Sequence, residues 1–197
     1  MTIGTDARLE RIGTDGKYMI VPMDHGITLG AVQGLKDIES TIDAITRGGA
    51  DAVLTQKGIA PRVHGNKNGS GFIVHLNAST VIGPDSNDKR RTGTVEEAVR
   101  AGADAVSYHI NVGSKHEPDQ IEDLSKMTAE ADRLGIPVLA MSYARGENLD
   151  GEDPEHDAEY LGQLLREIDV EPGDLVCFVI EAQRRQGRVH ADFERAR

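Results

Sequence analysis

Cysteine, lysine and long apolar runs are all scarce in this sequence. A single cysteine, Cys177, excludes an intramolecular disulfide framework and is typical of a reducing compartment. No apolar run approaches the roughly 18 residues needed to cross a membrane. The first residues also lack the pattern of a signal peptide. We therefore expect a cytoplasmic protein with no membrane association.

Positive charge is in short supply as well. The chain carries 33 acidic and 22 basic side chains, so its formal net charge is −11. Nucleic-acid binding needs clustered Lys and Arg, and this balance argues against such a partner. Only 7 of the basic residues are lysine. Excess acid with little lysine favours a protein adapted to high salt, where charge repulsion is screened, over an ordinary acidic cytosolic protein.

Short β-rich runs alternate with longer amphipathic stretches along the chain. The expected strands are Tyr18–Asp24, Ala52–Lys57, Phe72–Leu76, Ala105–Ile110 and Pro137–Tyr143. The expected helices are Leu35–Arg47, Thr94–Arg100 and Pro118–Leu134, with a further helix through about Ile168 after the acidic loop Glu147–Asp157. Residues Ala60–Ser70 and Val81–Gly93 lack periodicity and are expected to be loops on the functional side.

This alternation predicts an α/β fold with a parallel sheet, either open or closed into a barrel. An open nucleotide-binding sheet should carry a glycine fingerprint after its first strand, and Gly26 and Gly30 match none. Polar side chains instead follow all five strands, as at the active-site rim of a TIM barrel. Because the full barrel takes roughly 250 residues, we expect an incomplete (β/α)8 barrel of about five to six βα units.

Two strand ends carry side chains suited to acid–base chemistry. Asp24 follows a strongly apolar strand and could act as a general base, or it could merely cap a helix. Tyr143 ends the fifth strand and could donate a proton, while Arg145 could hold a phosphate or carboxylate. A half-buried tyrosine beside a solvated arginine is the alternative.

For three other residues at the strand ends, a structural role is the favoured interpretation. Lys57 could form a Schiff base, but an ion pair with a rim carboxylate is the favoured interpretation. His75 and His109 could together hold a metal ion. They lack close ligand spacing, however, so hydrogen-bonded histidines are favoured and no metal is expected.

Five segments together carry a family resemblance. They are VPMDHG at Val21–Gly26, VLTQKGI at Val53–Ile59, IVHLNAST at Ile73–Thr80, VEEAVRAGADAVSYHINVGS at Val95–Ser114 and YARG at Tyr143–Gly146. The sequence resembles the archaeal class I aldolases of the DhnA type, over about three quarters of its length. Within that family it is most similar to the transaldolase-type synthases of the route to 3-dehydroquinate, and fructose-bisphosphate aldolase is the alternative. A metal-dependent aldolase that uses His75 and His109 is a third interpretation.

The resemblance implies a TIM barrel that forms a lysine Schiff base with a sugar-phosphate ketone and needs no cofactor. The synthases cleave 6-deoxy-5-ketofructose 1-phosphate and join the retained fragment to L-aspartate semialdehyde, for aromatic amino acid biosynthesis. By the same resemblance Asp24 is the proton acceptor and Tyr143 the proton donor. The implied substrate contacts are Asp24, His25, Gly26, Ile27, Thr28, Tyr143, Ala144 and Arg145. A complete barrel of this family is expected to form a homo-oligomer.

The sequence departs from the family near its sixth strand. Gly173–Glu181 reads GDLVCFVIE, with Cys177 where the Schiff-base lysine is expected, and an arginine-rich stretch without a strand pattern follows. We therefore divide the chain into a partial barrel, residues 1–170, and a divergent tail, residues 171–197. The tail indicates either a reading-frame shift or a short paralogue, and the chain is either an impaired aldolase or a non-catalytic fragment that needs a partner chain.

Overall fold

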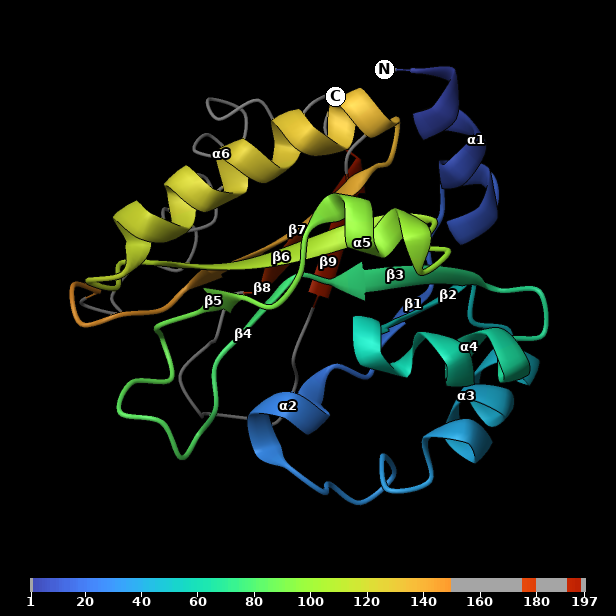
Figure 1. The fold of residues 1–197 in the computed structure, drawn as a ribbon, viewed down its shortest axis with the longest axis horizontal. Helices are drawn as coiled ribbons and strands as arrows, with labels where there is room; N and C mark the ends of the chain where they lie inside the picture. The colour runs from blue at the N-terminus through green and yellow to red at the C-terminus, as the bar shows by residue number, and fades with distance from the viewer. Residues whose placement is uncertain (1, 150–174, 180–190, 196–197) are drawn as a thin grey trace.

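The computed structural model describes residues 2–149, 175–179 and 191–195, and its centre is a mainly parallel sheet (Figure 1). The strands of the described main sheet follow the order β1-β2-β3-β6-β7-β8-β9. Its parallel strands are β1 (Ile20–Pro22), β2 (Ala52–Gln56), β3 (Gly71–His75), β6 (Ala105–Val112), β7 (Val138–Ala144) and β8 (Leu175–Val179). The last strand, β9 (Ala191–Arg195), is antiparallel to β8. A separate pair, β4 (Asn77–Ala78) and β5 (Arg90–Arg91), is also antiparallel.

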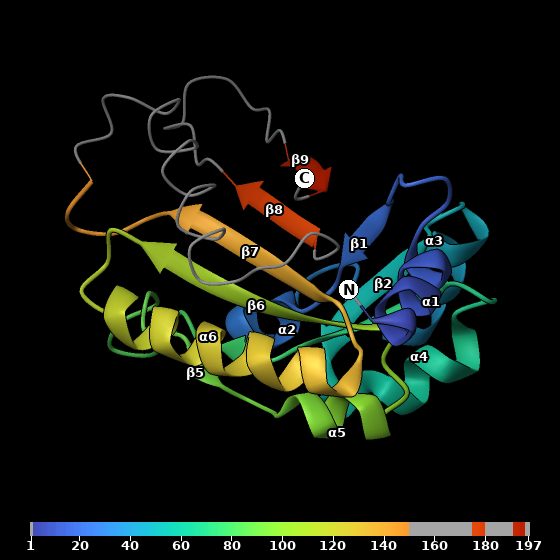
Figure 2. The same cartoon turned by 90° about the horizontal axis from the view of Figure 1, so that it is seen from above.

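Helices connect the parallel strands, and α5 and α6 lie along one face beneath β6 and β7 (Figure 2). The helices are α1 (Ile3–Ile12), α2 (His25–Leu29), α3 (Ile38–Arg47), α4 (Ala60–Asn66), α5 (Val95–Arg100) and α6 (Glu117–Leu134), with a 3-10 turn at Lys57–Ile59. A capping box opens α5, since Thr94 and Glu97 exchange side-chain-to-backbone hydrogen bonds. Gly135 ends α6 in the left-handed conformation that glycine adopts without strain.

The sheet separates two apolar clusters. Alternate strand residues such as Val74 and Val106 pack against the covering helices. Their neighbours Ile73 and Ala105 face the other side, where Leu9 and Ile12 of α1 pack against them. Helix α1 therefore covers the inner face of the curved sheet at the amino ends of its strands.

The predicted barrel architecture is confirmed in its described part. All five expected strands form, and the neighbours in the sheet follow chain order, as in a singly wound barrel. A doubly wound sheet would reverse direction at an internal strand. The sixth parallel strand, β8, lies within the expected segment Gly173–Glu181.

Three local expectations were wrong. The predicted loop Ala60–Ser70 contains α4, whose buried apolar residues, Ala60 and Val63, are too few to give a periodic signal. The expected strand Tyr18–Asp24 is shorter, because β1 ends at Pro22 and helix α2 begins directly after Asp24. The arginine-rich stretch after Glu181 was expected to hold no strand, yet β9 has the period-two alternation of ADFER at Ala191–Arg195.

Some expectations fall outside the described residues. These are the domain boundary at residue 170, the helix through Ile168 and most of the acidic loop Glu147–Asp157. Among the described helices, none is both long and apolar enough to cross a membrane.

Candidate active site

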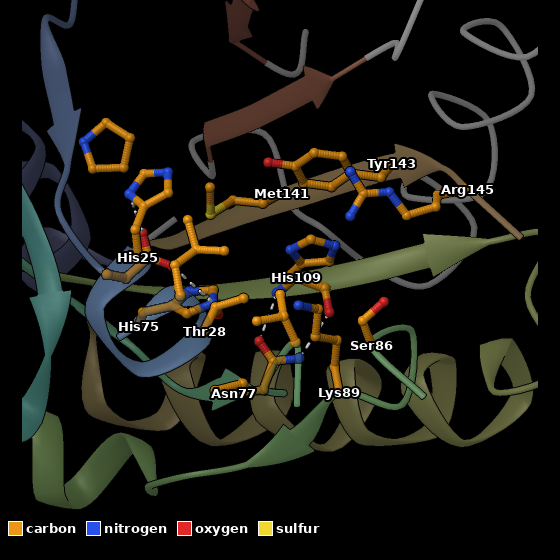
Figure 3. A pocket seen from close by; sticks show the side chains of 15 residues that line it. His25, Thr28, His75, Asn77, Ser86, Lys89, His109, Met141, Tyr143 and Arg145 are labelled. Atoms are coloured by element: carbon orange, nitrogen blue, oxygen red, sulfur yellow. Dashed lines mark hydrogen bonds and ion pairs between the residues drawn. The ribbon is translucent and has the colours of Figure 1, made fainter. Parts of the chain in front are cut away.

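A cavity of about 330 Å³ opens at the carboxyl ends of the parallel strands (Figure 3). Its walls come from the β1–α2 junction, the end of β3, the loop between β4 and β5, and the ends of β6 and β7. Residues distant in sequence, such as Asp24 and Tyr143, therefore share one small space. The volume lies at the lower end of the range typical of small-molecule sites.

Asp24 is held at the cavity wall without acting as a helix cap. It occupies the N-cap position of α2, but its side chain accepts no capping hydrogen bond. One carboxylate oxygen, Oδ2, lies 3.7 Å from Nε2 of His75, and Oδ1 lies 3.9 Å from Nδ1 of His25. The side chain is 19% exposed. The carboxylate is therefore available to a ligand in the cavity.

Two buried histidines line the cavity as neutral groups. Nδ1 of His75 and Oγ of Ser107 share a 2.7 Å hydrogen bond, and burial lowers the pKa of His75 to about 4, although Asp24 acts in the other direction. Nε2 of His109 lies 2.7 Å from Oδ1 of Asn111, and burial lowers the pKa of His109 well below its usual range. Hydrogen-bonded histidines were the favoured expectation, and in the described part of the chain no group of three or more His, Cys, Asp or Glu could hold a metal ion.

The end of β7 brings an aromatic ring and a cation to the same cavity. The Tyr143 ring stacks on His109, with centroids 4.1 Å apart and planes within 6°. The Arg145 guanidinium carbon lies 5.2 Å from the Tyr143 ring centroid, within cation–π range. The backbone N–H of Arg145 donates to the Val112 carbonyl oxygen, which fixes the end of β7 against β6.

Sequence reasoning missed Lys89, which also lines the cavity. It comes from the segment Val81–Gly93, which was expected to be an active-site loop, but no residue of that loop was singled out. Burial lowers the pKa of the Lys89 ammonium, the positive charge of Arg145 lowers it further, and Asp24 offsets part of this effect. The one available signal was a lysine in a polar loop next to the rim.

The structure brings together most of the residues singled out from the sequence. Of the eight implied substrate contacts, five line the cavity: Asp24, His25, Thr28, Tyr143 and Arg145. Gly26, Ile27 and Ala144 are not among its lining residues. Lys57 lies outside it, and its Nζ pairs with Oε1 of Glu97 at 2.7 Å, in line with the favoured ion-pair interpretation.

Cys177 occupies the sixth parallel strand of the sheet. The backbone register pairs it with Met141 of β7, and Met141 lines the cavity. The position at which the family resemblance implies a lysine is therefore a strand position next to the candidate site.

Parallel strands in chain order, with polar side chains at their carboxyl ends, define a fold of the (β/α) barrel class. A family model described as "DeoC/LacD family aldolase" matches residues 18–170. The chain belongs to this family of aldolases, as the resemblance implied.

Individual relatives narrow the similarity further. The chain is 68% identical, over 163 residues, to a 2-amino-3,7-dideoxy-D-threo-hept-6-ulosonate synthase of Halobacterium salinarum. The alignment covers 83% of this chain and 60% of the relative. It is 42% identical to synthase 1 of that name from Archaeoglobus fulgidus, over 73% of this chain and 55% of the relative. The chain thus spans less than two thirds of the length of these relatives. The acidic, lysine-poor composition predicted adaptation to high salt, and the similarity to a Halobacterium salinarum protein agrees with that prediction.

A solved structure gives the same architecture. An archaeal fructose-1,6-bisphosphate aldolase with its catalytic lysine covalently bound to a carbinolamine intermediate aligns with a TM-score of 0.69 at 29% identity. The alignment covers 84% of this chain and 67% of that protein. That protein is therefore a Schiff-base aldolase of the same fold.

Proposed function

We propose that this chain provides the acid–base residues of a class I aldolase active site. The site is that of a transaldolase-type synthase. Its substrates would be 6-deoxy-5-ketofructose 1-phosphate, a fragment of which is retained, and L-aspartate semialdehyde. One observation carries the proposal. In this aldolase-family chain, one cavity is lined by both Asp24 and Tyr143, which lie 119 positions apart in the sequence. The Asp24 carboxylate makes no helix-capping hydrogen bond, so it is available for proton transfer.

The proposed roles follow from the chemistry of these groups. Once an iminium is present to take the electron pair, as in a chain with a lysine at position 177, Asp24 accepts the hydroxyl proton when the carbon–carbon bond breaks. Tyr143 donates a proton to the alkoxide that develops when the new carbon–carbon bond forms. Arg145 binds an anionic group of the substrate. His75 and His109 are neutral near pH 7, so they support the cavity by hydrogen bonds without adding charge.

The proposal also covers what the chain lacks in the sixth strand. A class I aldolase forms an iminium between a lysine amine and the ketone carbonyl, and the thiol of Cys177 cannot form one. We therefore expect the unmodified chain to bind the sugar phosphate without forming a covalent adduct. The similarity to synthases favours this substrate over fructose bisphosphate, the substrate of the alternative aldolase.

Borohydride trapping tests the proposal. The unmodified chain is incubated with 6-deoxy-5-ketofructose 1-phosphate and borohydride, and intact mass and peptide mapping should show no adduct. The same treatment of Cys177→Lys should add one reduced adduct at position 177, because the new amine lies in the strand beside the cavity. Cys177→Arg is the matched control, since it adds charge without a reactive amine.

Turnover by the Cys177→Lys chain then distinguishes the substrates. Consumption of aspartate semialdehyde supports the synthase, and cleavage of fructose bisphosphate instead supports the alternative. Asp24→Asn in that background should lower turnover by about 100-fold. An adduct of the unmodified chain on Lys57 would overturn the role given to Cys177. Failure of the unmodified chain to bind either sugar phosphate in calorimetry would overturn the aldolase site itself and favour a non-catalytic fragment.

A further inference from the structure

The loop that carries Lys89 is fixed to the rest of the rim. The Asn87 carbonyl oxygen accepts hydrogen bonds from the side chains of Asn111 and Gln120, at 3.2 and 2.7 Å. Oδ2 of Asp85 lies 2.9 Å from Nζ of Lys115. The backbone N–H of Lys89 donates to the Asn87 carbonyl oxygen at 2.9 Å. The backbone at Lys89 is therefore positioned by contacts made before any ligand binds.

Nearly every charge near Lys89 in this loop has an opposite charge beside it. Asp88 lies 2.6 Å from Nε of Arg90, and Arg90 also reaches Asp119. Arg91 pairs with Asp123 at 2.8 Å. Within the part of the chain that the structure describes, Lys89 differs, because none of the ion pairs or side-chain hydrogen bonds there involves its Nζ.

Lys89 extends from its loop into the cavity, toward the His109 ring (Figure 3). Its charge acts on both His75 and His109, and the charges of Asp24 and Arg145 act on it. The described lining of the cavity includes one carboxylate, Asp24, one lysine, Lys89, and one arginine, Arg145. A half-buried ammonium without a counter-ion is costly, and an anion is what would compensate it.

We propose that Lys89 forms, together with Arg145, a binding subsite for an oxyanion of the substrate, its phosphate or its carboxylate. Arg145 offers a planar set of donors that matches such a group, and Lys89 adds a second point charge on a fixed loop. A bound oxyanion would give the Lys89 ammonium a counter-ion, which the ion pairs among the described residues do not provide. Lys89 is thus a binding residue, distinct from the amine that forms a Schiff base. The proposal rests on the proposed function only in attributing the oxyanion to an aldolase substrate.

Calorimetric titration of the full chain, at constant ionic strength, tests the subsite with two probes. Inorganic phosphate represents the sugar phosphate, and L-homoserine represents the carboxylate end of an amino-acid aldehyde. Lys89→Gln should weaken binding of at least one probe by about tenfold, because a charge-assisted contact is lost. Lys89→Arg should retain binding within about threefold, since it keeps the positive charge. The probe that is weakened identifies which oxyanion occupies the subsite.

Lys57→Gln is the matched control, because it makes the same change at a lysine that is paired with Glu97 and lies outside the cavity. It should leave both affinities unchanged. Equal weakening by Lys57→Gln and Lys89→Gln would overturn the proposal, as would the absence of binding by the unmodified chain. A borohydride adduct on Lys89 would overturn it too, by showing that the amine reacts with carbonyls. Anion binding needs no turnover, so its failure and failure of the Cys177→Lys trapping are separate results.

Discussion

Strands β3 and β6 are tied together at both ends by side chains, and the two ties differ in kind. At the amino end, Oδ2 of Asp104 accepts from the backbone N–H of Phe72 at 3.0 Å, while its Oδ1 pairs with Arg11 of α1 at 2.8 Å. At the carboxyl end, the amide of Asn77 exchanges two hydrogen bonds with the backbone of His109, at 2.7 and 3.0 Å. One tie is charged and anchors a helix, and the other is neutral.

This difference suits the separate tasks of the two ends. A charged tie at the amino end fixes α1 over the inner face, far from the cavity. At the carboxyl end a charged side chain in the place of Asn77 would compete with an anionic ligand for the proposed subsite at Lys89. The neutral amide of Asn77 and the neutral histidines avoid that competition. The amino end thus stabilises the sheet, and the carboxyl end remains available for a ligand, as in barrels generally.

The largest expected effect is a loss of stability from a change at the amino end of the strands, with ligand binding at the carboxyl end unaffected. Ile12 of α1 is fully buried in the inner cluster. Ile12→Ala should lower the free energy of unfolding by about 3 to 4 kcal/mol, since it leaves a cavity under the sheet. Urea denaturation in high salt measures it, and anion binding at the rim should persist in the folded variant. Ile3→Ala in the same helix is the control: Ile3 is 89% exposed, so its loss should cost about 0.5 kcal/mol or less. Equal losses from both variants would contradict the role given to α1.

The second prediction concerns how the free energy of unfolding depends on pH through a histidine at the carboxyl ends of the strands. Since the pKa of folded His75 is about 4, against 6.5 in the unfolded chain, the unfolded state binds more protons between these values. Stability should therefore fall by up to about 3 kcal/mol as pH drops from about 6.5 to about 4, with no further loss from this group below that. His75→Gln should flatten the dependence of urea stability on pH in this window. His109 contributes in the same direction, so the slope should decrease without vanishing. An unchanged slope in His75→Gln would show that the histidine is not buried as a neutral group.

The sequence predicted the parallel strands and the main catalytic candidates because both depend on local patterns. Short apolar runs specify buried strands, and the motifs around Asp24 and Tyr143 are contiguous. The alternation of strands and helices predicted a parallel sheet, and the polar side chains after each strand favoured a barrel, in which neighbouring strands follow chain order. Their convergence on one cavity was expected from the rule that strand carboxyl ends share an edge.

The parts that were missed depend on contacts between distant residues. Helix α1 is weakly amphipathic, and its position comes from Leu9 and Ile12 meeting strand residues far along the chain. Lys89 stands out because the neighbouring charges have partners, among them Lys115 with Asp85 and Asp119 with Arg90. Such pairing across about 30 positions of sequence leaves no trace in spacing or composition.

The smallest expected effect tests the charged tie itself. Arg11 is 57% exposed, so Arg11→Gln should lower the free energy of unfolding by only about 0.5 kcal/mol at low salt, and by less at molar salt, where screening is strong. A double-mutant cycle with Asp104→Asn isolates the pair, because the asparagine oxygen still accepts from the Phe72 N–H. The coupling energy, obtained from urea denaturation at low and high salt, should fall as salt rises.

The outcome bears on how the two ends are stabilised in a chain with a net charge of −11. If the coupling is screened away at molar salt, α1 is held there by the packing of Leu9 and Ile12, and the charge pair serves mainly to orient the helix. A coupling that is as strong at molar salt as at low salt would mean that Asp104 and Arg11 are shielded from solvent ions, and the amino end would then owe its stability to charge. The neutral tie at Asn77 has no such dependence on salt, so the two ends should diverge as salt changes.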